Sequence, residues 1–231
     1  MAARPRTIRP ITGPPDPGRD CPLCPRLAGY RQANRSAHPG FFNAPVPGLG
    51  PFDARLLIVG LAPGLKGANA TGRPFVGDGA GALLFRTLCR LGLADGEEPL
   101  GCRITNAVRC LPPANRPTAA EVAACRPFLA GEMEAMPNLR VVVALGRIAH
   151  DAVLRALGLR PAPLPFAHGA RHSLPDGRWL LDSYHCSRQN TNTGRLTPAM
   201  FEAVFAEARA LLPDTALCRV PRIHPGRLLV D

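Results

Sequence analysis

The stretch that decides the fold is RLLIVGLAPGLKGANATGRPFVGDGAG, residues 55–81. Its first six residues form a short apolar run, which is typical of a strand buried on both faces of a parallel sheet. A glycine-rich loop follows directly, and residues 79–91 then show the apolar spacing of a helix. A strand, a loop and a helix in this order form the repeating unit of α/β folds.

The same unit recurs along the chain. Strands are expected at residues 55–60, 103–108, 140–145 and 179–184, and helices at residues 79–91, 118–136, 147–157 and 197–212. Two helix starts carry specific signals, a capping box of Thr118 with Glu121 and a proline after Thr197. We therefore predict an α/β fold of three layers, α/β/α, with a central four-stranded parallel sheet. Ligands of such sheets bind at the carboxyl ends of the strands.

The composition predicts one domain with two extensions. A chain of 231 residues with 46% apolar side chains can bury one substantial core. We expect this domain at residues 21–213, a flexible arm rich in proline and arginine at residues 1–20, and a basic tail at residues 214–231. No apolar run reaches the roughly 18 residues of a membrane span, and no apolar signal segment is found. We therefore expect a protein of the bacterial cytosol, associated with the nucleoid, with no membrane partner.

The charge balance predicts a polyanionic partner. Lysine and arginine total 28 against 17 acidic residues, which gives a net charge of +11. Lys66 is the only lysine, so 27 of these cations are arginine, whose planar guanidinium suits phosphate. A genome rich in G and C inflates arginine together with alanine, glycine and proline, so charge alone does not establish nucleic-acid binding.

Four of the eight cysteines have the spacing of metal ligands. Cys21 and Cys24 form a pair in CPLC, while Cys110 and Cys125 lie far downstream with fourteen residues between them. Two distant segments can converge on one metal centre in this way. A redox CxxC site is disfavoured because the pair follows a proline-rich coil rather than a strand. Zinc and an iron-sulfur cluster both accept four thiolates, and the spacing does not separate them.

Two loops are candidates for ligand binding. The loop after the first strand, residues 60–81, holds seven glycines, which let backbone amides approach a ligand closely. It matches neither a P-loop nor GxGxxG, which disfavours hydrolysis of nucleoside triphosphates and binding of dinucleotides. The loop after the fourth strand, HCSRQNTNTGRLT at residues 185–197, is dense in hydrogen-bond donors.

Several motifs in these segments together resemble one known family. GLAPG at residues 60–64, TGRPFVGD at residues 71–78, the HxSRQNTNTG pattern from His185 and the four-cysteine layout are similar to the family 5 uracil-DNA glycosylases, the UDGb group of the uracil-DNA glycosylase superfamily. The resemblance covers roughly residues 21–212. It implies a DNA repair enzyme that flips uracil and related deaminated or damaged bases out of DNA and hydrolyses the N-glycosidic bond, leaving an abasic site. It also implies a structural 4Fe-4S cluster ligated by Cys21, Cys24, Cys110 and Cys125.

With this resemblance, we expect roles for ten residues. His185 is expected to be catalytic by donating a hydrogen bond to the charge that develops on the leaving base, and Asp78 and Asn69 by positioning water. Asp78 has the alternative role of capping the helix that starts beside it. Substrate binding is expected from the backbone amides of Leu61 and Ala62 as an anion site, Phe75 stacked on the flipped base, Asn106 reading its Watson–Crick edge, and Ser187, Arg188 and Gln189 filling the vacated space and gripping phosphates.

The sequence departs from the superfamily pattern at two places. GLAPG contains no acidic residue, which is typical of the UDGb group and leaves open which residue activates water. Cys186 follows His185 where relatives commonly have proline, which would alter the rigidity of the loop and the base preference. Cys89 and Cys102, outside the four-cysteine layout, are expected to be buried core residues.

Two other classes of function stay open from the residues alone. One is a non-catalytic nucleic-acid-binding module with a structural metal site. The other is an enzyme acting on small phosphorylated metabolites, for which the chain offers no lysine-bearing phosphate motif. For a glycosylase we expect a monomer acting on double-stranded DNA that carries a lesion or mismatch, because a mismatched base costs least to flip.

Overall fold

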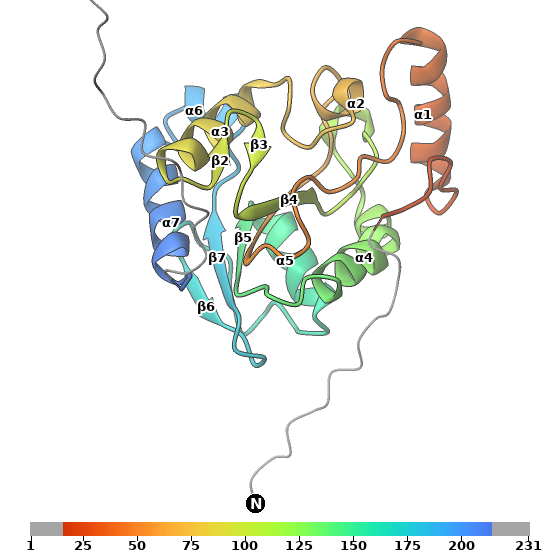
Figure 1. Cartoon of the computed structure of the whole chain (residues 1–231). Coiled ribbons are helices and arrows are strands. Elements are labelled where there is room, and N and C mark those ends of the chain that lie inside the picture. The colour runs from red at the N-terminus through yellow and green to blue at the C-terminus, as the bar shows by residue number, and fades with distance from the viewer. Residues whose placement is uncertain (1–15, 214–231) are drawn as a thin grey trace, which may run out of the picture.

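The structure is a computed structural model that describes residues 16–213. Residues 1–15 of the predicted arm and the whole predicted tail, residues 214–231, lie outside the described residues. A five-stranded sheet with the order β4-β1-β5-β7-β6 lies at the centre (Figure 1). Its strands are β1 (Leu56–Gly60), β4 (Cys102–Asn106), β5 (Val141–Leu145), β6 (Arg171–Ser173) and β7 (Trp179–Ser183).

The four predicted strands are confirmed as a parallel set. β1 pairs with β4 and β5, and β5 pairs with β7, all in parallel. The predicted number of strands is corrected to five, because β6 adds an antiparallel edge next to β7. Its three residues read RHS and are largely exposed. An edge strand of this kind lacks the apolar run by which the four parallel strands could be predicted.

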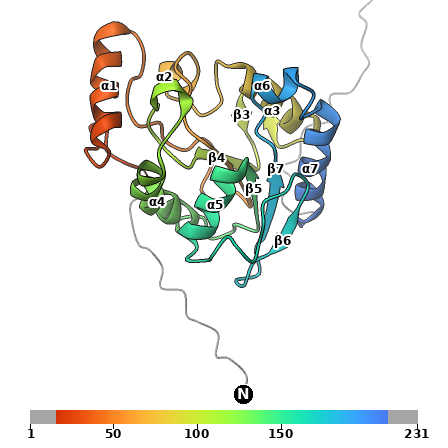
Figure 2. The same cartoon turned by 180° about the vertical axis from the view of Figure 1, so that it is seen from behind.

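Helices cover both faces of the sheet, as predicted. α3 (Gly79–Arg90) and α7 (Pro198–Ala210) contact each other on one face. α4 (Ala119–Glu134) and α5 (Arg147–Ala156) pack together on the other face. The two opposite views show the sheet between these pairs (Figures 1 and 2).

The predicted helix starts are also confirmed. Thr118 caps α4 by accepting a hydrogen bond from the Glu121 backbone N–H, and the Glu121 carboxylate accepts one from the Thr118 N–H in return. Thr197 caps α7 through the N–H of Met200. These caps satisfy backbone donors that have no partner inside the helices.

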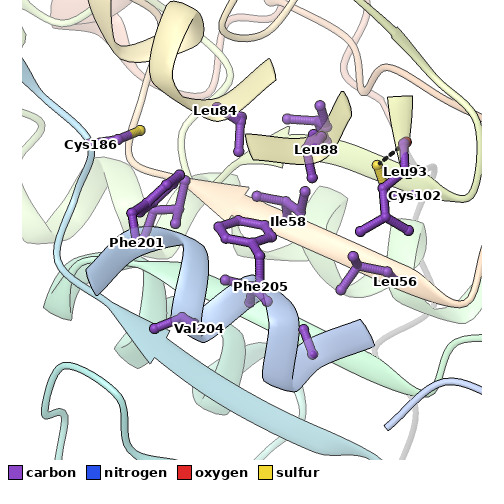
Figure 3. Packing of buried hydrophobic residues seen from close by; sticks show 14 of the residues in the cluster. Leu56, Ile58, Leu84, Leu88, Leu93, Cys102, Cys186, Phe201, Val204 and Phe205 are labelled. Carbon is purple, nitrogen blue, oxygen red and sulfur yellow. Dashed lines mark hydrogen bonds between the residues drawn. The ribbon is translucent and has the colours of Figure 1, made fainter. Parts of the chain in front are cut away.

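Side chains alternate along β1 between two cores. Leu56 and Ile58 point to the core beneath α3 and α7, where Figure 3 shows them beside Phe205. Leu57 and Val59 point to the core beneath α4 and α5. Every residue of β1 is buried, which explains why its sequence is continuously apolar rather than alternating.

The remaining cysteines differ in burial. Cys102 is buried as predicted, and its thiol donates to the carbonyl of Leu93. The prediction for Cys89 was wrong: it is exposed in the last turn of α3, where its thiol faces the carbonyl of Gly96. Cys186 is 1% exposed and packs into the core near Phe201 (Figure 3). It therefore supports the loop after β7 from within the core.

Several further elements were not predicted from the sequence. These are α1 (Pro25–Ala37), α2 (Ala68–Thr71), α6 (Arg188–Asn192), a 3-10 turn at Pro113–Asn115, and a hairpin of β2 (Ala94–Asp95) and β3 (Glu98–Pro99). α1 is tied to α4 by Arg26, whose guanidinium donates two hydrogen bonds of 2.8 and 2.7 Å to Glu121. Within the described residues, no helix is long and apolar enough to cross a membrane.

Two helical glycines provide a test of the packing around the glycine-rich loop. A Cβ on Gly81 would overlap the carbonyl of Phe75, whereas a Cβ on Gly29 of α1 would meet nothing within 4 Å. Gly81→Ala should therefore lower the free energy of unfolding by about 1–3 kcal/mol, while Gly29→Ala should raise it by about 0.5–1 kcal/mol. Thermal and denaturant unfolding measure both changes. Equal effects of the two substitutions would contradict the described packing.

Candidate active site

The candidate site lies at the carboxyl ends of the parallel strands. The loop after β1, the end of β4 and the loop after β7 meet there, and α2, α3 and α6 lie along the same edge of the sheet in both views (Figures 1 and 2). Gly60 ends β1 and pairs with Asn106 at the end of β4. Both loops singled out in the sequence therefore reach one place, as expected for a parallel sheet.

Phe75 and Asn106 come together over Gly60, and His185 stacks on Phe75. The rings of Phe75 and His185 are stacked with their centroids 6.0 Å apart. A Cβ on Gly60 would lie 2.6 Å from the Phe75 ring and would overlap the side-chain oxygen of Asn106. The missing side chain of Gly60 thus lets an aromatic ring and an amide approach each other.

The amide of Asn106 has unused hydrogen-bonding capacity. Asn106 is only 4% exposed, yet its side chain makes no hydrogen bond to any of residues 16–213. A buried amide normally has partners, because desolvation without a hydrogen bond costs free energy. Asn106 is therefore placed to bind a group that offers both a donor and an acceptor.

His185 is partly buried and uncharged at neutral pH. Burial lowers the pKa of its imidazole, against a smaller opposing influence from the charge of Asp78. The side chain of Asn190 in α6 donates to the His185 carbonyl at 2.8 Å and fixes the backbone there. A neutral imidazole at this position can donate one hydrogen bond and accept another.

Asp78 caps α3 and also faces the glycine-rich loop. Its Oδ1 accepts a hydrogen bond of 2.9 Å from the Gly81 N–H. Its Oδ2 lies toward the other side, 2.6 and 3.5 Å from where a Cβ would stand on Gly67 and Gly64. The alternative prediction, that Asp78 caps α3, is therefore confirmed. Its second carboxylate oxygen still faces the glycine-rich loop.

Asn69 braces the same loop from below. It is 3% exposed, and its amide group donates a 2.8 Å hydrogen bond to the side chain of Asn43. Asn43 in turn donates to the carbonyls of Asn34 and His38 at the end of α1. The side-chain N–H group of Asn69 therefore holds Asn43, which is itself bonded to the end of α1.

The other predicted residues lie around the rim. The carbonyl of Leu61 accepts from the Val108 N–H, and Ala62 packs against a group of apolar and cysteine side chains. Ser187 is the N-cap of α6, and its hydroxyl accepts from the Asn190 N–H. Two exposed side chains follow it, those of Arg188 and Gln189. Arg188 extends over the start of α3, where its Nε lies 2.6 Å from the Cβ position of Gly79.

Comparison with known proteins identifies the group to which this arrangement belongs. Residues 47–209 match the model of the uracil-DNA glycosylase superfamily. The chain belongs to that superfamily. It is 48% identical over 204 residues to a type-5 uracil-DNA glycosylase of Thermus thermophilus, covering 83% of this chain and 93% of the relative.

More distant relatives separate two branches of the superfamily. A type-5 uracil-DNA glycosylase of Mycobacterium leprae is 43% identical over 208 residues, 83% of this chain and 91% of the relative. A type-4 uracil-DNA glycosylase of Pyrobaculum aerophilum is 40% identical over 147 residues, 63% of this chain and 65% of the relative. The type-5 relatives thus match this superfamily member over more of its length.

A pocket of about 370 Å³ beside His185 was missed by the sequence analysis. Its wall is formed by Gly146, Arg147, Phe166, Ala167, Tyr184, His185, Asn190 and Arg195. The guanidinium of Arg195 lies 4.5 Å from the ring centroid of Tyr184, and that of Arg147 lies 5.7 Å from the ring centroid of Phe166. Two cations held on aromatic rings beside the site suit phosphate groups.

The four cysteines predicted to be metal ligands line one small pocket. Cys21 precedes α1, Cys24 is its N-cap residue, and Cys110 and Cys125 come from the other side. The N–H of Arg109 donates to the Cys125 sulfur at 3.3 Å, and Arg31 donates to the Cys110 sulfur at 3.5 Å. The two segments therefore converge, as their spacing predicted.

The chemistry of this pocket fits a metal group that stabilises thiolates. Burial raises the pKa of Cys110 to about 11 and that of Cys125 to about 12, so the bare thiols stay protonated. A different group of side chains, His150, His172 and Asp182, has its possible ligand atoms within 4.8 Å of one another, and it is the only such group among the described residues. The four cysteine sulfurs line one pocket, and both zinc and an iron-sulfur cluster accept four thiolates.

Two substitutions of Asp78 separate its cap from its charge. Asp78→Asn keeps an N-cap acceptor and should change stability little, whereas Asp78→Ala should lower the free energy of unfolding by about 1 kcal/mol. Both remove the charge that raises the pKa of His185, so that pKa should fall further below its ordinary value in both variants. Thermal unfolding and ¹⁵N NMR titration of the His185 ring measure the two effects.

The pH dependence of stability gives a second check on His185. Because its pKa in the folded chain is lowered, the unfolded chain binds its proton first as the pH falls below about 6.5. This contribution to stability is therefore complete above that pH and declines as the pH falls toward the lowered folded pKa. A His185 ring that titrates at its ordinary pKa would contradict the described burial.

Proposed function

We propose that this protein is a monofunctional DNA glycosylase of base excision repair, which removes uracil and related deaminated or damaged bases and leaves an abasic site. The observation that carries this function is the position of Asn106. Its nearly buried amide has unused hydrogen-bonding capacity and lies against Phe75, which is itself stacked with His185. Membership of the superfamily and the names of the type-5 relatives support the same reaction.

Base recognition would use Phe75 and Asn106. A base inside a duplex is out of reach, so it must be flipped out at a cost of a few kcal/mol. The flipped ring would stack on Phe75, and the amide of Asn106 would pair with one donor and one acceptor of its Watson–Crick edge. The left-handed φ of +60° at Phe75, unusual for a bulky residue, holds its ring toward Gly60.

Bond cleavage would depend on a hydrogen bond from His185. As the glycosidic bond breaks, the sugar gains oxocarbenium character and the base gains negative charge. Neutral His185 donates to the base as this charge develops, and the backbone amides of Leu61 and Ala62 serve as a preformed anion site. A donor that strengthens only in the transition state raises the turnover number rather than the affinity.

Water would be positioned by the loop after β1. Asp78 Oδ2 points toward this loop and can orient water or offset positive charge on the sugar. Asn69 contributes from beneath, through the bond to Asn43 that fixes the loop. Asp78 is thus the stronger candidate for a direct role, and Asn69 for a supporting one.

DNA would be held by arginines on either side of His185. Arg188, with Ser187 and Gln189, reaches across the start of α3 to brace the space left by the flipped base. Arg147 and Arg195 line the pocket beside His185, where they would meet phosphates of the damaged strand. We propose double-stranded DNA with a lesion or mismatch as substrate, a monomeric enzyme and the bacterial cytosol as its location, consistent with the net charge of +11.

We further propose that Cys21, Cys24, Cys110 and Cys125 hold a 4Fe-4S cluster. Their convergence on one pocket supports a shared metal group, and the resemblance to the type-5 relatives favours an iron-sulfur cluster over zinc. When bound, such a cluster would supply a covalent link between α1 and the body of the protein. No redox step is needed for hydrolysis of the glycosidic bond.

A uracil-containing duplex tests the function directly. The purified protein should release free uracil and leave a strand that breaks on treatment with alkali, since only a glycosylase leaves an abasic site. His185→Ala should lower the turnover number by about 10²–10³ and change duplex affinity far less. Single-turnover kinetics and a binding titration separate the two quantities. A protein that binds the duplex and never liberates a base would be a non-catalytic binding module.

Removal of one cysteine tests the cluster. Cys125→Ser should lower the bound iron and the visible absorbance of the purified protein, and it should lower the midpoint of thermal unfolding. Cys89→Ser is the matched control, because Cys89 is exposed on α3 and outside the pocket. Elemental analysis that finds one zinc and no iron in the unsubstituted protein would replace the cluster with a zinc site.

A further inference from the structure

A second group of titratable side chains surrounds Asp182, three residues before His185. Asp182 is fully buried on β7. Its Oδ1 lies 2.7 Å from Nδ1 of His150, and its Oδ2 lies 3.2 Å from Nε2 of His172. The backbone N–H of Ala167 also donates to Oδ2, at 3.4 Å. One carboxylate therefore joins α5, β6 and the segment between them.

The hydrogen bonds of His150 require two ring protons. Its Nδ1 faces the carboxylate of Asp182, and its Nε2 lies 2.8 Å from the carbonyl oxygen of Leu164. The carbonyl oxygen only accepts hydrogen bonds, and so does Asp182 as a carboxylate. A neutral imidazole has one N–H and would leave two acceptors facing each other, whereas an imidazolium satisfies both contacts. His150 is fully buried, so an unsatisfied contact would be costly.

A proton fits the space between His150 and Asp182 better than a metal ion does. His150, His172 and Asp182 have the residue types and proximity of a metal site. However, the 2.7 Å between Nδ1 and Oδ1 is a hydrogen-bond distance. Two ligands of a tetrahedral zinc ion at about 2.0–2.1 Å would lie about 3.3 Å apart.

These bonds secure a wall of the pocket beside His185. The backbone of Asp182 bonds to Gly169 and Ala170 on the same segment. Phe166 and Ala167 of that segment line the pocket. His150 lies in the first turn of α5, where its N–H donates to Gly146, another residue of the pocket wall.

We propose that His150 and Asp182 form a buried imidazolium–carboxylate pair that fixes this wall and so positions the DNA-binding pocket next to His185. The proposal rests on the proposed glycosylase function for its consequence, but the pair itself is independent of the reaction. His150 and Asp182 act here as positioning residues, since neither lines the pocket.

The charges around His150 favour its protonated form. Burial by itself lowers the pKa of His150, but the hydrogen bond and charge of Asp182 on β7 outweigh it and raise the pKa above the ordinary value. Asp151 on the same helix acts in the same direction. His172 on β6 contacts the His150 ring edge-on. Arg147 on α5 lies over the ring of Phe166, which also contacts His150.

NMR of the unsubstituted protein tests the pair without any substrate. In protein labelled with ¹⁵N-histidine, both ring nitrogens of His150 should carry protons at pH 7, and the ring should titrate above its ordinary pKa of about 6.5. One bare nitrogen at pH 7, or zinc bound in equal amount at this site, would overturn the proposal. This result is independent of whether the protein cleaves any base.

Kinetics test the consequence for DNA. KM for a uracil duplex should rise about tenfold as the pH is raised through the elevated pKa of His150 and the ring loses its proton, while kcat changes little. His150→Gln should have the high KM throughout and lose this pH dependence. Asp176→Asn, an acid-to-amide change in the exposed turn before β7, should keep the unsubstituted profile. An alkaline rise of KM that persists in His150→Gln would refute the positioning role.

Discussion

The close approach of side chains over Gly60 sets the geometry of the site. Gly60 pairs with Asn106 in the parallel ladder, so the two strand ends are fixed by backbone hydrogen bonds. Only a residue without a Cβ lets the Phe75 ring lie against this pair. Phe75 itself has a left-handed backbone, and its carbonyl occupies the space above Gly81. The ring is therefore placed by two glycines and a strained backbone, which together resist displacement by a bound ligand.

The loop that carries these residues is braced from the cysteine pocket. Ala62, in the same loop, packs against the buried cluster of Leu27, Val108, Cys125 and Phe128, and Cys21, Cys24 and Cys110 pack against the same cluster. On the other side, Arg109 links the pocket to the core, since its backbone donates to Cys125 and its guanidinium pairs with fully buried Glu132 at 2.5 Å. The proposed cluster would therefore hold the loop after β1 in place, which is a structural role that needs no electron transfer.

The sequence predicted those parts of the structure that are set by local pattern. β1 and β5 have unbroken apolar runs and β7 begins with one, and the capping box at Thr118 marks its helix start directly. The edge strand β6 was not predictable in this way, because RHS has no apolar run and pairs along one side only. Cys89 was predicted to be a core residue because its neighbours in α3 are apolar. Whether its side chain faces the core or the solvent depends on which face of α3 packs against the sheet, and Cys89 is on the exposed face.

The candidate site was predictable to the same extent. Motifs named the residues of the two loops, and the parallel sheet explained why these loops meet. Arg147 and Arg195 were missed because their position on Phe166 and Tyr184 results from tertiary packing, and nothing local distinguishes them among 27 arginines. Ser187 was a signal for the start of α6, because its hydroxyl is an N-cap acceptor. The polar composition of residues 185–197 nevertheless led to the prediction of a loop.

A neutral His185 in a chain of net charge +11 has a physical reason. Positive charge on the surface attracts DNA at long range, and it acts equally before and during bond cleavage. A charged imidazole would bind phosphate or the intact base strongly in the ground state, which would not accelerate the reaction. Burial keeps the pKa of His185 low, so in the proposed reaction its hydrogen bond would gain strength mainly as the base becomes an anion. In the proposed mechanism, the arginines at the rim would therefore contribute to binding, and the uncharged donor at the centre would contribute to catalysis.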